Sequence, residues 1–397
     1  MQMTRIAVIF ESSPFDRKGL FNAVHNRVKG LLETGECWVD AYCIHAKDNM
    51  LTRALRHTPY VPQTDSVELE GIRYKMLWYR FSICDHLMLE KCGKRPPMFR
   101  RFMDTYVRFL EGYDYVIAHS FTGALFAYEA KQRYGIPYFA NWHGSDVHTH
   151  PWRVSVILED TKKVMEAAKC NFFVSKALMK ASDKITVDAC KEVLYNGVSE
   201  DFMRLDEKCR NKARERFGVS RDEKVVAFAG NLVNVKNVLV LPDIFKSVTE
   251  HFDAPVHFII AGDGKLRKQL EANFASIRQC VHVSFLGNVA AEEMPELMNC
   301  VDVLVLPSLN EGLPLVCAEA MRCGANVVGS DVGGIAEVIG KDNAVPHSPD
   351  FVPQFAKKVV AMLQTAPKQE VPAEISWSKT TSIELSYINE CKQQKVC

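Results

Sequence analysis

Two glutamates lie eight positions apart in the segment Asn310–Met321, which follows the apolar run Val301–Leu306. The apolar run predicts a buried strand, and Pro314 favours the first turn of a helix, because proline has no N–H to satisfy and its φ is already helical. Glu311 then lies before the helix and Glu319 about two turns inside it, roughly 9 Å along the axis. The free N–H groups of the first turn form an anion site between them. This layout suits a ligand with hydroxyls at both ends and a diphosphate between them, as in a sugar nucleotide.

Three further loops join a predicted strand to a helix through glycine. Gly230 ends a strand and Lys236 opens a helix shortly after it, where a lysine can meet phosphate oxygens as a point charge. Gly333–Gly334 lies between a buried strand and a helix; its bare N–H groups can cradle an anion, and tight packing alone is the alternative explanation. His143 is followed by a glycine that lets the backbone approach a ligand, although a purely structural histidine needs no ligand.

The sequence favours no metal site near these loops. His148 and His150 follow His143, but the spacing lacks a cysteine partner and Pro151 disfavours a regular ligand-bearing helix. Asp263, between two glycines, is better placed to cap the following helix than to bind metal.

Strand-like apolar runs alternate with amphipathic helical segments, which is typical of parallel sheets with crossover helices. The expected strands are Ile6–Phe10, Val39–Ile44, Tyr115–Ala118, Tyr138–Ala140 and Phe172–Val174 in the first half, and Val225–Ala229, His257–Ala261, Val281–Leu286, Val303–Leu306 and Val327–Ser330 in the second. The expected helices include Leu20–Leu32, Gly123–Tyr134 and Val154–Ala168.

A chain of 397 residues is too long for one ordinary core, and a boundary fits after Asn196–Val198. We therefore expect an α/β fold of two Rossmann-like, doubly wound domains. The N-terminal domain takes in residues 1–198 and the C-terminal domain residues 199–373, and a C-terminal crossover helix lies in residues 374–397. The loop Ser12–Gly19 faces the ligand crevice of such a fold but is not a GxGxxG loop, so it does not favour a nicotinamide or flavin cofactor.

The composition is that of an ordinary globular protein, with 47% hydrophobic and 24% charged residues and a formal net charge of +1. It favours neither disorder nor nucleic-acid binding. We expect no secretory leader and no bilayer-spanning segment. The 13 cysteines are scattered without a CxxC pair, which favours reduced thiols and a cytoplasmic location.

Residues 46–112 interrupt the alternation of strands and helices. Basic and aromatic residues interleave in Arg73–Phe81 and again in Lys91–Phe102. Such segments can lie on an anionic membrane, here as a peripheral contact with the inner face of the plasma membrane. The alternative, a solvated helix-loop that buries its aromatics in its own domain, stays open.

The order of these motifs resembles the retaining GT-B glycosyltransferases of family 4, also called glycosyl transferases group 1, which transfer sugars from nucleotide donors. The resemblance covers most of the chain and is densest from Val225 to Ile339. It is carried by His143–Asp146, Asn196–Val198, Gly230 with Lys236, Glu311 with Glu319, and Gly333–Gly334. It implies two facing Rossmann-like domains, with the acceptor on the N-terminal one and the donor mainly on the C-terminal one.

The resemblance also implies roles for single residues. The expected catalytic residues are His143, Glu311 and Lys236. The expected donor-binding residues are Gly19, Asn231, Lys236, Glu311, Gly312, Leu313, Pro314, Leu315, Glu319, Gly333 and Gly334. Glu311 would face the transferred sugar, Glu319 would bind the ribose hydroxyls and Lys236 would neutralise the diphosphate. The two carboxylates thus hold the sugar and the ribose rather than acting as a general acid and base, and neither a metal nor a cofactor is implied.

Asn231 departs from the family pattern, which usually has arginine directly after the glycine that corresponds to Gly230. Losing a guanidinium leaves one fixed cation for two phosphates. We expect Arg17 or Lys18 in the first loop to supply the missing charge.

The leading hypothesis is therefore a metal-independent hexosyltransferase that uses a uridine or guanosine diphosphate sugar. A glycan or lipid-linked acceptor in polysaccharide or cell-envelope synthesis fits residues 73–102. Two alternatives stay open: a sugar-nucleotide epimerase on a similar scaffold, and a non-catalytic sugar-nucleotide binding protein, which Asn231 makes conceivable.

Overall fold

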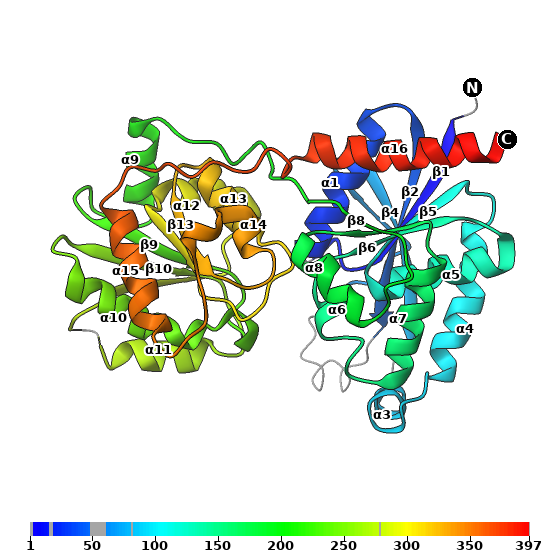
Figure 1. Ribbon diagram of the computed structural model, residues 1–397, viewed down its shortest axis with the longest axis horizontal. Coiled ribbons are helices and arrows are strands. Elements are labelled where there is room, and N and C mark those ends of the chain that lie inside the picture. The colour runs from blue at the N-terminus through cyan, green and yellow to red at the C-terminus, as the bar shows by residue number, and fades with distance from the viewer. Residues whose placement is uncertain (1–2, 16–18, 48–60, 81, 278, 397) are drawn as a thin grey trace. The chain divides into compact units, whose positions relative to one another are not determined.

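The computed structural model describes residues 3–15, 19–47, 61–80, 82–277 and 279–396 (Figure 1). The chain forms two compact units, one of residues 1–196 with 377–397 and the other of residues 197–376. Each unit is a mainly parallel α/β sheet, so the expected pair of Rossmann-like domains is confirmed. Arg17 and Lys18 lie outside the described residues.

The described residues of the first unit form an eight-stranded sheet with the order β3-β4-β2-β1-β5-β6-β7-β8. The strands are β1 Thr4–Glu11, β2 Cys37–Lys47, β3 Ser66–Leu69, β4 Ile72–Arg80, β5 Tyr115–His119, β6 Tyr138–Trp142, β7 Cys170–Phe173 and β8 Lys191–Val193. Neighbouring strands pair in parallel except β3 with β4. The winding changes direction between β1 and β5, which is the kind of place where doubly wound sheets bind ligands.

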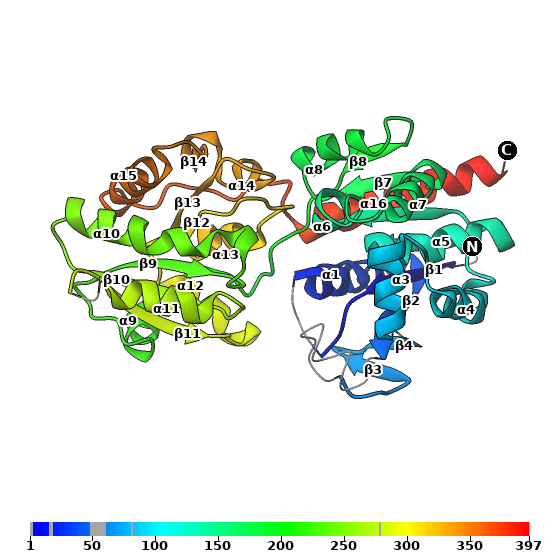
Figure 2. The ribbon, with the colours of Figure 1, turned by 90° about the horizontal axis from the view of Figure 1, so that it is seen from below.

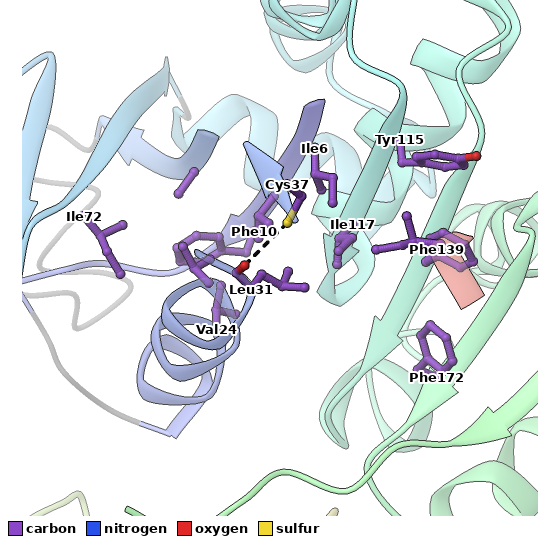
Figure 3. Close-up of a cluster of buried hydrophobic side chains, with 14 of the residues drawn as sticks. Ile6, Phe10, Val24, Leu31, Cys37, Ile72, Tyr115, Ile117, Phe139 and Phe172 are labelled. Atoms are coloured by element: carbon purple, nitrogen blue, oxygen red, sulfur yellow. Dashed lines mark hydrogen bonds between the residues drawn. The ribbon is translucent and has the colours of Figure 1, made fainter. Parts of the chain in front are cut away.

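In the described residues of the first unit the helices are α1 Gly19–Glu33, α3 Ile83–Cys92, α4 Pro97–Tyr106, α5 Ser120–Tyr134, α6 Ser145–His148, α7 Ser155–Ala167, α8 Lys176–Ala181 and α16 Trp377–Val396. Figure 3 shows the core in which Phe10 of β1 meets Val24 and Leu31 of α1. Leu385 and Ile388 of α16 belong to the same buried cluster. The last helix of the chain is therefore an integral part of the first unit.

The structure corrects the helix-loop alternative for residues 73–80 and agrees with its burial of aromatic residues. Residues 73–80 belong to β4, which pairs in parallel with β2. Tyr74 and Tyr79 are buried, and Phe102 of α4 packs on Tyr79 with their ring centroids 5.1 Å apart. These aromatic residues, on which the membrane hypothesis rested, therefore contribute to the core of their own unit.

The second unit contains a six-stranded parallel sheet with the order β11-β10-β9-β12-β13-β14, which Figure 2 shows across the unit. Its strands are β9 Lys224–Ala229, β10 Val256–Ala261, β11 His282–Gly287, β12 Val303–Leu306, β13 Asn326–Ser330 and β14 Ala344–Val345. Its helices are α9 Glu207–Arg216, α10 Leu241–His251, α11 Arg267–Ala275, α12 Met294–Cys300, α13 Leu315–Arg322, α14 Ile335–Ile339 and α15 Phe351–Leu363. Here the winding changes direction between β9 and β12.

In the part of the chain that the structure describes, no helix combines the length and the apolar character needed to cross a bilayer. The twelve cysteines in that part are free thiols.

Candidate functional site

Lys236 and Glu311 meet where the sheet of the second unit changes direction. Lys236 follows β9 and Glu311 follows β12, and these two strands are neighbours. The Lys236 Nζ lies 2.5 Å from the Glu311 Oε1, and both side chains are largely buried. Ser308, which the sequence analysis did not single out, donates its hydroxyl to the same Oε1 at 2.7 Å. Two charged groups from separate loops thus form one ion pair at the carboxyl edge of the sheet.

The sequence predicts that Lys236 opens an α-helix, and the structure differs. Lys236 ends a short 3-10 turn, Asn234–Lys236, which is followed by Asn237 at a φ of +50°. The Leu309 N–H donates to the Val235 carbonyl at 2.8 Å, so the β9 and β12 loops are also joined through their backbones.

Gly333 and Gly334 hold the backbone of Glu311 in place. The Gly334 N–H donates to the Glu311 carbonyl at 3.2 Å. Gly333 has a φ of +53°, and a Cβ at that position would lie 1.9 Å from the same carbonyl oxygen. One of the two amides expected to be bare is therefore bonded to protein. These contacts support the packing explanation for Gly334, since its N–H is not free to bind an anion.

Gly333→Ala should lower kcat/KM by about 100-fold, because the new methyl group must displace the Glu311 carbonyl and the carboxylate that follows it. Gly340→Ala is the matched control: Gly340 also has a positive φ, +81°, but its nearest neighbouring atom would be 3.9 Å from the Cβ. Steady-state kinetics on both variants checks the prediction. Equal losses would assign the effect to backbone strain rather than to the displacement of Glu311.

The helix α13 begins one residue later than expected. Pro314 is its N-cap residue, and Glu319 is the fifth helical residue, so Glu319 lies about one turn inside the helix rather than two. Among the described residues, the N–H groups of Gly312, Leu313 and Leu315 have no hydrogen-bond partner, and all three residues are half-buried. These N–H groups are available to donate to an anion at the start of α13.

Glu319 differs from Glu311 in its surroundings. Its carboxyl group is half-buried and has no hydrogen-bond or ion-pair partner in the described part of the chain. Burial raises the pKa of Glu319 to about 7. A carboxyl group that is withdrawn from water and unpaired is suited to receive hydroxyl groups from a ligand.

Asn231 is exposed in the loop after β9. The next residue, Leu232, donates its N–H to the Asp263 carbonyl at 2.9 Å, which joins this loop to the one after β10. The expectation that Asp263 caps a helix was wrong: α11 begins at Arg267, and the Asp263 carboxylate instead lies 3.3 Å from the Arg267 guanidinium. Gly262 allows the loops after β9 and β10 to lie this close, since a Cβ at Gly262 would lie 2.0 Å from the Gly230 carbonyl oxygen.

In the first unit, His143 is paired with a histidine that the sequence analysis missed. The His143 Nε2 lies 3.0 Å from the Nδ1 of His119, which ends β5 and is fully buried. Burial lowers the pKa of His143 to about 3 and that of His119 well below its usual value, and the nearby Arg27 guanidinium acts in the same direction. Both rings are therefore neutral, and one donates to the other. The position of His119, a polar residue at the carboxyl end of a strand, was the available signal.

Asp146 fixes the turn that carries His143. Its carboxylate accepts the N–H of His143 at 3.1 Å and that of Gly144 at 2.8 Å. Gly19 is the first residue of α1 and is exposed, and a Cβ there would meet no atom within 4 Å.

Two family models match the chain. The model of glycosyltransferase family 4 matches residues 52–202, and the model of glycosyl transferases group 1 matches residues 223–365. The fold is similar to that of the Anabaena protein HepE, solved with UDP and glucose, at a TM-score of 0.67 and 16% identity, covering 98% of this chain and 99% of that one.

Two curated relatives are similar in sequence. A candidate teichuronic acid biosynthesis glycosyltransferase, TuaC of Bacillus subtilis, is 25% identical over 56% of this chain and 54% of its own length. The N-acetyl-alpha-D-glucosaminyl L-malate synthase of Bacillus anthracis is 28% identical over 57% of each chain. The chain thus spans about half the length of these curated relatives. With both family models matched and the two-domain fold observed, the chain belongs to the family 4, or group 1, glycosyltransferases of the GT-B fold.

Proposed function

We propose that this protein is a retaining glycosyltransferase that moves a sugar from a nucleoside-diphosphate sugar to a glycan or lipid-linked acceptor in polysaccharide or cell-envelope synthesis. The observation that carries the proposal is the Lys236–Glu311 ion pair beside the unpaired amides at the start of α13. The names of the curated relatives support the reaction class, and the UDP held by HepE favours a uridine diphosphate sugar as the donor.

Lys236 and the α13 amides would act on the leaving diphosphate. Negative charge grows on that group as the glycosidic bond breaks, and a cation and fixed N–H groups stabilise it more than they stabilise the bound donor. When the phosphates arrive, Lys236 exchanges its carboxylate partner for phosphate oxygens. Glu311 is then released to accept hydroxyl groups of the transferred sugar.

The family resemblance supports retention of configuration by same-face displacement, assisted by the leaving phosphate. No protein nucleophile is required for that route. His143 is neutral and would contribute a hydrogen bond to the transferred sugar rather than a charge. With Asn231 in place of the usual arginine, the compensating charge from Arg17 or Lys18 remains part of the proposal.

A panel of nucleotide sugars tests the reaction class. The proposed transferase releases free sugar and nucleoside diphosphate slowly by transfer to water. Interconversion of the donor without release would identify an epimerase, and thermal stabilisation without turnover would identify a binding protein. The anomeric configuration of a transferred product, read by NMR, tests retention.

Glu319→Gln should raise the Kd for the donor by roughly 10–100-fold, because charge-assisted hydrogen bonds to the ribose are worth about 1.5–3 kcal/mol. The wild-type Kd should fall as the pH rises through about 7, where the carboxyl group ionises and becomes the stronger acceptor. Calorimetry with UDP across this pH range checks both points. The same measurements on Glu319→Gln give the pH dependence that comes from ionisation of the UDP phosphate alone. If both proteins had the same pH profile, Glu319 would not contact the donor.

A further inference from the structure

Three side chains with metal-binding atoms meet at the opposite edge of the second sheet, where its strands begin. Glu223 directly precedes β9, His257 is the second residue of β10, and His282 is the first residue of β11. These three strands are parallel neighbours, and His257 pairs directly with His282 in the register. Lys236 follows the other end of β9, and Glu311 follows the same end of its parallel neighbour β12, so this cluster is separate from the proposed donor site.

The spacing of the ligand atoms fits one metal ion. One atom from each side chain, two imidazole nitrogens and a carboxylate oxygen, lies within 4.8 Å of the other two. The His282 Nδ1 is 3.3 Å from the Glu223 Oε1, and the His257 Nδ1 is 3.8 Å from the Glu223 Oε2. In a tetrahedral zinc site with bonds of about 2.0–2.1 Å, neighbouring ligand atoms are about 3.4 Å apart.

His257 provides the independent observation. Its side chain is only 2% exposed, and its Nδ1 is buried without a hydrogen-bond partner. Its other nitrogen, Nε2, lies 2.8 Å from the Ser284 hydroxyl. When Nε2 donates to Ser284, the lone pair of Nδ1 faces Glu223. Metal-binding histidines are commonly oriented in this way by a hydrogen bond from their second nitrogen.

We propose that Glu223, His257 and His282 bind a Zn²⁺ ion, with water as the fourth ligand. Two imidazoles and one carboxylate are ligands that zinc accepts, whereas magnesium and calcium prefer oxygen alone. The ring of His282 stacks on that of His257 with their centroids 4.0 Å apart, so a rotation of His282 would aim both rings at one ion. The side chain of His282 is 59% exposed, which leaves it room to turn. The ion would tie together the starts of three strands, including the edge strand β11.

Zinc stoichiometry tests the proposal. The exposed thiols are first alkylated, because cysteines bind zinc on their own. The metal-free protein is then dialysed against micromolar Zn²⁺, and the metal is counted by atomic emission. Wild type should retain one zinc ion per chain, while His282→Gln and Glu223→Gln should retain none. His251→Gln is the matched control, since His251 is an exposed histidine on α10 outside the cluster, and it should bind as wild type does.

Two further measurements keep the proposal falsifiable if a variant folds poorly. In the wild-type full chain, free zinc at a hundred times its Kd should raise the Tm for unfolding of the second unit by roughly 5–10 °C. Co²⁺ in place of Zn²⁺ should give the visible bands of a nitrogen and oxygen site without thiolate charge-transfer bands. The absence of saturable binding, equal binding by His282→Gln, or thiolate bands would each overturn the proposal. UDP affinity should be the same in His282→Gln and wild type, so this test does not depend on the proposed glycosyl transfer.

Discussion

Glu311→Gln should lower kcat by about 100–1000-fold and leave the KM for the donor within a few-fold of wild type. The substitution keeps the volume and the hydrogen bond from Ser308 but removes the negative charge paired with Lys236. If Glu311 acts on the transferred sugar, its charge matters most when positive character develops on that sugar. Steady-state kinetics on the identified donor, with initial rates across donor concentrations, measures the two constants separately.

Glu250→Gln is the control for Glu311. Glu250 is an exposed glutamate of α10 that pairs with Lys246 one turn away, so its loss should change neither constant. Far-UV circular dichroism and the Tm establish that both variants fold. A rise in KM with kcat unchanged would show instead that Glu311 contributes to ground-state binding of the donor.

Arg27→Met should reduce the free energy of unfolding of the first unit by about 3–5 kcal/mol, because it leaves a buried carboxylate without its cation. Arg27 of α1 is 2% exposed and lies 3.1 Å from Glu384 of α16 and 3.0 Å from Asn196. Its guanidinium also donates to the Leu194 carbonyl at 3.3 Å. Denaturant unfolding monitored by circular dichroism measures the loss.

Lys29→Met is the matched control for Arg27. Lys29 lies on the same helix, but its ion pair with Glu70 is half exposed, and its removal should cost less than about 1 kcal/mol. The double variant Arg27→Met, Glu384→Met should recover part of the stability, because no buried charge is then left alone. Similar losses in Arg27→Met and Lys29→Met would contradict the importance of the buried pair.

The sequence predicted the central strands of both sheets because of how parallel sheets bury them. Strands such as β1 and β12 are covered on both faces and appear as continuous apolar runs. β4 was missed because one of its faces carries charged residues: Lys75, for example, lies 2.8 Å from Asp40. Its alternation of basic and aromatic residues is the period-two pattern of a strand with one polar face.

The site was predictable in its loops but not in its contacts. Glycines after predicted strands indicated where Lys236 and Glu311 lie along the chain. Their ion pair joins residues 75 positions apart and depends on β9 lying next to β12, which no local pattern specifies. The bond from the Gly334 N–H to Glu311 and the pairing of His119 with His143 depend on the same long-range order.

The placement of α16 has a consequence for the order in which the two units finish folding during synthesis. Asn196, the last residue of the first unit's N-terminal segment, and Glu384 are both held by Arg27, and Thr380 donates to the Tyr195 carbonyl at 2.6 Å. Leu385 and Ile388 also fill the core of that unit. During translation the ribosome must therefore complete the whole second unit before the first can close its core. The second unit is continuous in sequence and can fold while the chain is still growing, so the half that is synthesised first is the half that finishes folding last.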